Sequence, residues 1–147
     1  MNDQTFLQHM KSSWVEAEQV PEKVFLFQLF QFAFSYDDDN RRCRIECPVV
    51  EAMFNPLGTV HGGMLTYLAD TAIGHLNFRF KEDPYVSIEL KTSYIKAVTS
   101  GKLIATASYV KDGYNVVFTE CTIENEHGEL VSTTSGTFYR YAKGSKK

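Results

Sequence analysis

A histidine followed by two glycines, His61-Gly62-Gly63, opens an apolar stretch whose spacing predicts a helix over residues 61–77. The first N–H groups of a helix have no partner within the helix and carry a partial positive charge. They therefore receive anions, or oxygens that become negative during a reaction. Glycine has no side chain to keep a ligand away from the backbone. Paired glycines equally suit a tight turn or close packing of a helix on a sheet, and the spacing alone supports both interpretations.

An isolated carboxylate, Asp70, interrupts the same apolar stretch near its middle. Aspartate is a poor residue inside a helix and a costly one to bury, so it needs a partner or a chemical task. One structural interpretation pairs it with Arg79 or with a lysine elsewhere. His61 likewise has a structural role open to it, which is to fix the helix start by hydrogen bonding. A helix start that stabilises an oxyanion and a carboxylate on the same helix are, however, two of the parts needed to hydrolyse an acyl derivative.

The separation of these two groups has a consequence for assembly. Asp70 follows Gly62 by eight positions, which is about 12 Å along a helix that rises about 1.5 Å per residue. One carbonyl does not easily touch both groups within one chain. If both act on one substrate, Asp70 must come from a second copy of the helix, and the small residues Gly63, Thr66 and Gly74 suit its close approach. The spacing therefore predicts a homodimer with two sites at its interface.

Hydrophobic periodicity predicts the elements that position this helix. Residues 4–19 predict a short amino-terminal helix with one apolar stripe that caps the core. Alternation predicts a strand through Phe30, Phe32 and Phe34, the turn 37–40 and a return strand over 42–47. After the central helix, period-two patterns predict four more strands, over residues 85–94, 102–111, 115–125 and 129–141. In the first of these, Val86, Ile88, Leu90 and Tyr94 share one face and Ser87 lies on the other.

The composition of the central helix predicts how the sheet lies. A wide apolar face comprises Leu65, Leu68, Ala69, Ala72, Ile73 and Leu76, and the remaining side is small or weakly polar: Gly63, Thr66, Asp70, Gly74 and Asn77. Lys, Arg and Glu are absent from residues 61–77. A helix with so little charge is not expected to present a broad face to water. We therefore expect an α+β fold in which an antiparallel sheet of about six strands wraps around one long helix.

Length and composition bound the remaining possibilities. We expect one domain over residues 1–147, with a helical extension at 1–20 and a flexible basic tail at 143–147. The net charge of -3 argues against nucleic acid and anionic lipid as partners. Residues 1–19 lack the basic start and apolar stretch of a secretory signal, and the apolar run 24–34 is too short to span a membrane, so we expect a cytoplasmic protein. The three cysteines, Cys43, Cys47 and Cys121, are expected to be reduced and buried, and no metal site is predicted.

The spacing Asn55, Gly58, His61-Gly62-Gly63 and Asp70 resembles the signature of the hotdog-fold acyl-CoA thioesterases. The resemblance is greatest to the phenylacetate-pathway and 4-hydroxybenzoyl-CoA thioesterase type. It covers residues 28–141 as architecture, whereas the detailed match is confined to residues 55–74. It implies the hotdog fold, homodimers that often pair into homotetramers, and a site shared between subunits.

The resemblance also implies roles for individual residues. The N–H of Gly62 or of Gly63 would polarise the thioester carbonyl, and Asp70 of the facing subunit would act as nucleophile or as general base. Asn55 and His61 would orient the carbonyl, the loop or the attacking water. On the strand after the helix, Ser87 matches a hydroxyl that helps to hold this water, with Thr92 as the alternative. Thr66 and Gly63 complete the set expected at the substrate. No cofactor is implied, because CoA enters as part of the substrate.

Two other functions remain open from the sequence. Hydratases and dehydratases also use the hotdog fold, but they pair a catalytic His with an acidic residue in a proline-containing loop that is not found here. A non-catalytic acyl-CoA sensor is usually joined to a partner domain, for which 147 residues leave no room. The acyl group itself stays undetermined, because aromatic residues at strand spacing are more often core than tunnel.

Overall fold

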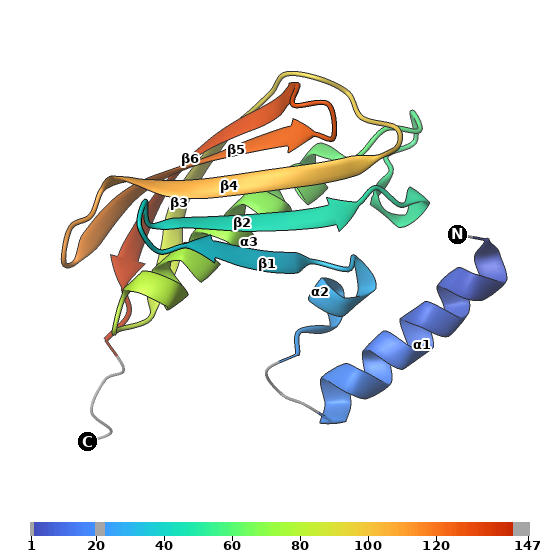
Figure 1. The fold of residues 1–147 in the computed structure, drawn as a ribbon, viewed down its shortest axis with the longest axis horizontal. Coiled ribbons are helices and arrows are strands. Elements are labelled where there is room, and N and C mark those ends of the chain that lie inside the picture. Colours follow the sequence, from blue (N-terminus) through green and yellow to red (C-terminus); the bar gives the residue numbers. More distant parts are fainter. Residues whose placement is uncertain (1, 20–22, 143–147) are drawn as a thin grey trace.

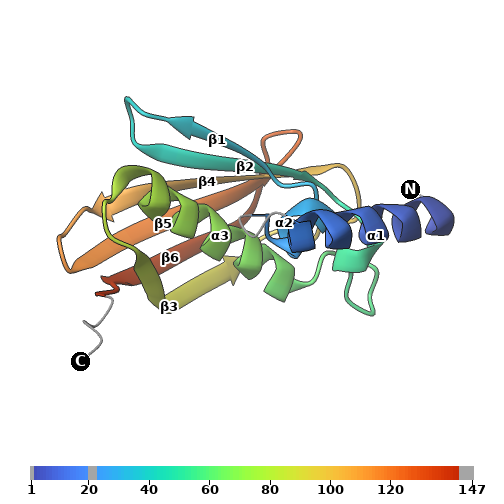
Figure 2. The ribbon, with the colours of Figure 1, turned by 90° about the horizontal axis from the view of Figure 1, so that it is seen from below.

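The structure is a computed structural model that describes residues 2–19 and 23–142. One antiparallel sheet, in the order β1-β2-β4-β5-β6-β3, curves around helix α3, Gly62–Phe80 (Figures 1 and 2). The strands are β1 Ala33–Asp37, β2 Arg42–Pro48, β3 Tyr85–Tyr94, β4 Lys102–Lys111, β5 Val116–Asn125 and β6 Leu130–Arg140. Helices α1 Asp3–Gln19 and α2 Phe25–Leu29 precede the sheet, and a short 3-10 helix, η1 Glu51–Met53, precedes α3. This is the predicted hotdog arrangement of six strands, one long helix and a short amino-terminal helix.

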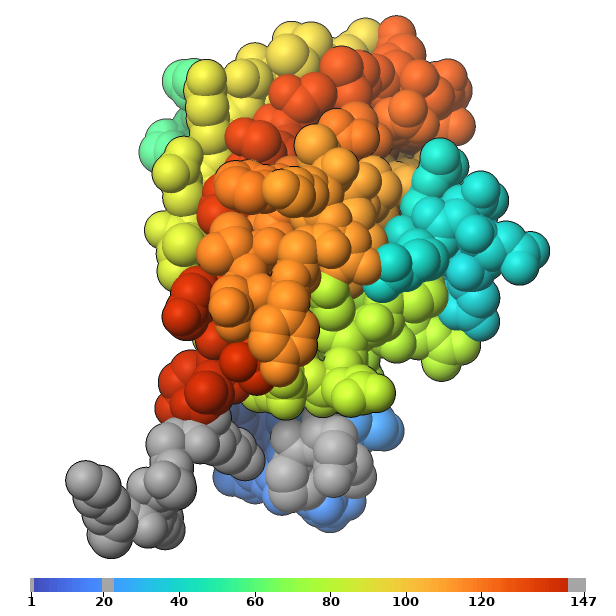
Figure 3. Space-filling view, turned by 90° about the vertical axis from the view of Figure 1, so that its left-hand side faces the viewer, coloured from blue at the N-terminus to red at the C-terminus, as the bar shows by residue number. Residues whose placement is uncertain are grey.

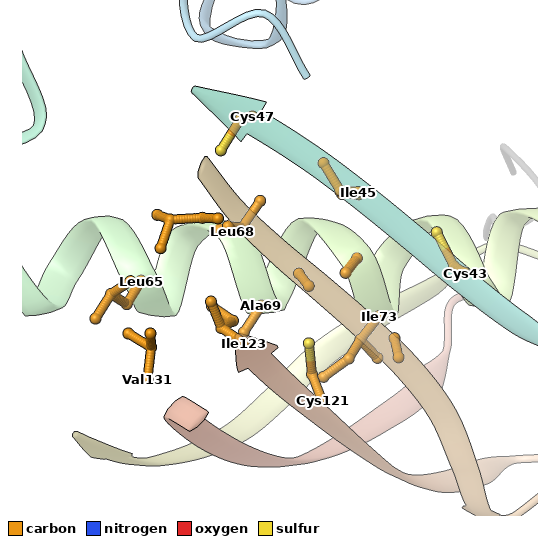
Figure 4. Packing of buried hydrophobic residues seen from close by; sticks show 14 of the residues in the cluster. Cys43, Ile45, Cys47, Leu65, Leu68, Ala69, Ile73, Cys121, Ile123 and Val131 are labelled. Atoms are coloured by element: carbon orange, nitrogen blue, oxygen red, sulfur yellow. The ribbon is translucent and has the colours of Figure 1, made fainter. Parts of the chain in front are cut away.

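The core fills the space between α3 and the concave face of the sheet. Figure 4 shows Leu68, Ala69 and Ile73 of α3 directed toward Ile45 and Ile123 on the strands. All five side chains are at most 2% exposed. Cys43, Cys47 and Cys121 are free and lie in this core, as predicted, and burial raises the pKa of each thiol to about 12. The apolar face of α3 is thus held against the sheet, which fixes the orientation of its other faces.

The segment before β1 differs from the prediction. Phe30 is not in a strand but caps the carboxyl end of α2, and β1 begins at Ala33. Gln31 has a φ of 53°, and this left-handed residue turns the chain between the helix and the strand. Phe32 stacks on the α2 residue Phe27 at a centroid distance of 5.6 Å, and Phe34 packs edge-to-face on the same ring at 5.5 Å. The alternating phenylalanines therefore belong to an aromatic cluster between α2, β1 and α3, only part of which is a strand.

A β-bulge in β3 corrects the predicted division of that strand into faces. The register with β6 shifts between Ser87 and Glu89. Leu90 packs against the core, but Val86 and Ile88 are 46% and 61% exposed, because the extra residue reverses the side on which the strand points. The prediction of one apolar face containing all three residues is therefore wrong. The same bulge turns Ser87 toward α3.

The central helix ends three residues later than predicted, and one residue was assigned to the wrong side. Asn77, expected on the weakly polar side, is 1% exposed, and the Tyr109 hydroxyl donates to its Oδ1 at 3.1 Å. Beyond Asn77 the helix emerges between the β1–β2 and β4–β5 hairpins, as the space-filling view shows (Figure 3). Asp112 of the second hairpin binds both Arg41 of the first and Lys81 at the end of α3. These ion pairs hold the carboxyl end of α3 in place.

Helix α1 lies at the edge of the molecule, on α2 (Figure 1). Trp14 packs edge-to-face on Phe25 at a centroid distance of 5.5 Å, and His9 Nε2 lies 3.0 Å from the Gln28 carbonyl oxygen. Phe6 and Met10 reach the core, so the predicted capping is confirmed for these two residues. In the described part of the chain, no helix is both long and apolar enough to cross a membrane. The predicted tail, 143–147, lies outside the described residues.

Candidate active site

The start of α3 is organised by His61, which is its N-cap residue. The Gly63 N–H donates to His61 Nδ1 at 2.8 Å, and the Met64 N–H donates to the His61 carbonyl oxygen at 2.9 Å. The Gly62 N–H has no acceptor among the described residues. Of the two N–H groups predicted as donors to a substrate, Gly63 is therefore engaged and Gly62 is available.

The absence of side chains at Gly62 and Gly63 lets the side chains of Tyr94 and His61 lie close to the start of α3. An added Cβ at Gly62 would lie 2.9 Å from Cζ of Tyr94, and one at Gly63 would lie 3.1 Å from Nδ1 of His61. Tyr94, at the end of β3, thus rests on the first turn of α3. Its proximity to Gly62 was missed from the sequence, because the pairing of a strand end with a helix start depends on the tertiary fold. Glycine at 62 therefore lets Tyr94 lie this close to the helix start, and a larger residue there has to displace the end of the Tyr94 side chain.

Asn55 shapes the loop that leads into α3. Its Oδ1 accepts hydrogen bonds from the Leu57 and Thr59 N–H groups at 2.9 and 3.3 Å, and its Nδ2 donates to Thr59 Oγ1 at 2.9 Å. Asn55, Gly62 and Tyr94 line a shallow hollow of about 290 Å³ beside the first turn of α3. The structure therefore places Asn55, His61 and Gly62 together around the start of α3. A larger hollow of about 540 Å³, beside α1, contains none of the predicted site residues.

Asp70 lies half-buried two turns further along α3. Burial raises the pKa of its carboxyl group, and the nearby Ser87 hydroxyl partly opposes this rise. Arg79, considered as a partner from the sequence, binds Asp38 instead, with 2.8 Å between Nη2 and Oδ2. No salt bridge to Asp70 is present in the described residues. A half-buried carboxylate with no cation paired to it among the described residues retains its capacity to accept a proton.

Thr66 and Thr92 belong to a line of hydroxyl groups between α3 and the sheet. Thr66 Oγ1 donates to Thr92 Oγ1 at 3.2 Å and lies 2.8 Å from the Tyr94 hydroxyl. Thr92 continues to Thr134 at 2.9 Å. Of the two hydroxyls considered near Asp70, Ser87 is the one beside it, and Thr92 contacts Thr66 instead. Thr66 lies midway between Gly62 and Asp70 along α3, and its hydroxyl group anchors the Tyr94 hydroxyl.

The fold thus places the Gly62 N–H and the Asp70 carboxylate on one helix, too far apart for both to contact the same carbonyl group. Gly62 and Asp70 are eight residues apart, about 12 Å along α3. Each has its own supporting residue on β3, Tyr94 for Gly62 and Ser87 for Asp70. No cluster of His, Cys, Asp and Glu able to hold a metal ion is found among residues 2–19 and 23–142. The chemistry available is that of a helix-start N–H donor and a carboxylate base or nucleophile.

Comparison with known proteins defines the class of this chain. Residues 57–132, more than half of the chain, match the family model of the thioesterase superfamily, and the chain belongs to this family of thioester hydrolases. It is 32% identical to a candidate esterase of Vibrio cholerae over 57% of each chain. It is 25% identical to one of Thermoplasma acidophilum over 82% of this chain and 94% of that protein. The chain thus spans little more than half the length of the Vibrio protein.

Solved structures show the same fold over nearly the whole chain. A Bacillus halodurans protein crystallised with CoA has a TM-score of 0.85 and 26% identity, and the match covers 97% of each chain. The Escherichia coli PaaI protein, from the phenylacetic acid degradation operon, has a TM-score of 0.75 at 20% identity. That match covers 91% of this chain and 96% of PaaI. These likenesses support the hotdog fold.

Proposed function

We propose that this protein is an acyl-CoA thioesterase that hydrolyses an aryl- or fatty-acyl-CoA to the free acid and CoA. The observation that carries the proposal is the pairing, on one helix, of an available N–H at Gly62 with a half-buried carboxylate at Asp70. The family match supports thioester hydrolysis, and the CoA bound to the Bacillus halodurans protein supports a CoA thioester as substrate.

In the proposed reaction, water attacks the thioester carbonyl carbon and Asp70 takes a proton from it. The carbonyl oxygen becomes an oxyanion that the Gly62 N–H stabilises. The tetrahedral intermediate then collapses, the carbon–sulfur bond breaks, and the CoA thiolate takes up a proton. In the alternative route, the carboxylate itself attacks the carbonyl carbon, the carbon–sulfur bond breaks and the CoA thiolate leaves, which forms a mixed anhydride. Water then hydrolyses the anhydride to the free acid and regenerates the Asp70 carboxylate. Ser87 is placed to hold the attacking water beside Asp70, while His61 and Asn55 keep the helix start and its loop in position.

The site is proposed to form between two copies of the chain. Asp70 of one subunit would act on the thioester held at Gly62 of its partner, since one carbonyl does not span about 12 Å along α3. Gly63 is exposed, so the first turn of α3 is open to a second helix. We propose a homodimer, or a tetramer of two such dimers. The buried free thiols fit the reducing cytoplasm, where we place the enzyme.

Release of free thiol from a panel of acyl-CoA substrates tests this function. Turnover that falls at least about a hundredfold in Asp70→Asn supports the proposal, since this is the usual contribution of a general base. Wild-type turnover in that variant would remove Asp70 from the mechanism. Binding of acyl-CoA without turnover of any substrate would favour a sensing module. Hydration of an enoyl-CoA with the thioester left intact would favour a hydratase.

A further inference from the structure

A third hollow, of about 330 Å³, lies beside the carboxyl-terminal half of α3. Its lining consists of Gly74 and Phe78 on the helix and of the segment 81–85, which leads into β3. Gly74 and Phe78 follow Asp70 at steps of four residues, so all three lie along one face of α3. Tyr85, on the opposite wall, stands two residues before Ser87 on the same strand and on the same side of it. The hollow therefore adjoins the Asp70–Ser87 pair.

The walls of this hollow are open and largely apolar. A Cβ added at Gly74 meets no atom within 4 Å, and Phe78 is 81% exposed. The Lys81 ammonium group is held by Asp112 and by the Gly113 carbonyl oxygen, at 3.0 Å from the latter, so its charge is already compensated. Glu82, at the rim, disfavours a ligand that ends in a carboxylate. An uncharged apolar group suits this lining best.

We propose that the acyl group of the substrate passes over Gly74 into this hollow, and that Gly74 and Phe78 determine the length of acyl group that the enzyme accepts. The substrate class is then an apolar acyl or aryl group longer than acetyl. This inference rests on the proposed function, because it takes Asp70 as the group at the thioester. Gly74 acts here through the absence of a side chain, since any branched residue at this position projects into the path from Asp70 to Phe78.

Gly74 has a competing role, which is close packing between the α3 helices of two subunits. The two roles predict different effects of added bulk. If Gly74 lies on the acyl path, Gly74→Leu leaves the assembly intact and lowers kcat/KM more for long acyl groups than for short ones. If Gly74 is a packing contact, Gly74→Leu dissociates the subunits and lowers turnover of all substrates alike.

The experiment compares Gly74→Ala, Gly74→Leu and Phe78→Ala with wild type on acetyl-, hexanoyl- and decanoyl-CoA. Gly74→Leu should lower kcat/KM for hexanoyl-CoA at least about tenfold relative to acetyl-CoA, which equals the loss of about two buried methylene contacts. Gly74→Ala is the matched control. It adds only a methyl group in open space and should raise the Tm, because glycine is unfavourable inside a helix. Phe78→Ala, at an exposed position, should shift the preference toward decanoyl-CoA.

Binding of the non-hydrolysable thioether hexyl-CoA, measured by calorimetry together with the mass of the assembly, separates this inference from the proposed function. Loss of hexyl-CoA affinity in Gly74→Leu at unchanged mass supports the acyl path even if no acyl-CoA is hydrolysed. Hydrolysis by wild type with an unchanged ranking of acyl lengths in Gly74→Leu and Phe78→Ala overturns the inference and leaves the thioesterase function standing. Dissociation of Gly74→Leu, with equal losses on all substrates, also overturns it.

Discussion

The Nδ1 atom of His61 accepts a 2.8 Å hydrogen bond from the N–H of Gly63, two residues further along the chain. The histidine thereby caps α3 and takes up one of the two glycine N–H groups at its start. The other N–H, that of Gly62, has no acceptor among the described residues. The helix start therefore presents one available N–H donor, that of Gly62. His61 supports this donor indirectly, because it caps the helix and occupies the neighbouring N–H of Gly63.

Replacement of Gly62 by proline removes this donor selectively. Gly62 is the first residue of α3, where proline is well tolerated, and His61 has the extended conformation (φ -62°, ψ 134°) that precedes proline. Gly62→Ala is the matched control, because both variants push against Tyr94 but only proline lacks the N–H. We expect kcat to be about 10²- to 10³-fold lower in Gly62→Pro than in Gly62→Ala. Equal kcat in the two folded variants would show that this N–H does not stabilise the oxyanion.

Asp70 is expected to reduce the stability of the fold at neutral pH. Its folded-state pKa is raised above the ordinary value, so the carboxylate form is disfavoured in the folded protein. Asp70→Asn should therefore have a higher Tm than wild type at pH 7, by roughly 2–4 °C for each kcal/mol recovered. The difference should shrink as the pH falls toward about 4, the ordinary pKa of aspartate, because both states then bind the proton. Thermal unfolding between pH 4 and 8 measures this, and a lower Tm of Asp70→Asn at pH 7 would contradict it.

Ser87 is expected to set the acid side of the pH–rate profile. Its hydroxyl stabilises the Asp70 carboxylate and lowers the pKa of that group. Ser87→Ala should therefore move the acid limb of kcat/KM toward higher pH. The rate on the alkaline plateau should fall by only roughly fivefold, the effect of one hydrogen bond of about 1 kcal/mol. Thr92→Val is the control, and its acid limb should stay in place because Thr92 contacts Thr66 and Thr134. A limb that moves equally in both variants would speak against a specific role of Ser87.

His75 is expected to make the fold less stable in acid. Its ring stacks on Phe34 at a centroid distance of 4.1 Å, and Nδ1 lies 3.1 Å from the Tyr36 hydroxyl. Burial lowers the pKa of His75, so protonation favours the unfolded chain. The corresponding stability is complete above about pH 6.5 and is lost as the pH falls toward the folded-state pKa. His75→Phe keeps the stacking, and its free energy of unfolding at pH 8 should lie within about 1.5 kcal/mol of that of wild type.

Urea titrations of wild type and His75→Phe from pH 8 to pH 5 measure this difference. The free energy of unfolding of wild type should fall through this range by more than that of the variant. Parallel curves for the two proteins would exclude His75 as the titrating group.

The parts of the fold that follow from periodicity were predictable from the sequence. The long helix, the turn at 37–40 and the four strands after the helix are confirmed. Each of these elements buries one side, so its apolar residues recur at the period of a helix or a strand, and this period can be seen in the sequence. The α2 helix was missed, because its five residues are too few to show a helical period and Phe30, Phe32 and Phe34 imitate a strand.

Contacts that depend on tertiary register could not be predicted in this way. The β3 bulge reverses the faces of that strand, and no local signal for it precedes Ser87. The sequence kept both Ser87 and Thr92 as candidates beside Asp70, and only the bulge distinguishes them. The contacts of Tyr94 with Gly62 and of Tyr109 with Asn77 likewise depend on where the strands β3 and β4 lie against α3 in the folded protein. The roles of the site residues and the dimer stay predictions.

Mixing of two inactive variants tests most directly whether Gly62 and Asp70 of different chains share a site. Gly62→Pro and Asp70→Asn are co-refolded, and thiol release is compared with that of each variant alone. A mixed dimer then has one site with both groups intact, so random mixing should restore roughly a quarter of wild-type turnover in a two-fold symmetric dimer. The mass of the assembly is measured on the same samples. Restoration to this level is the result expected of a shared site, and turnover no higher than the average of the two variants alone would contradict it.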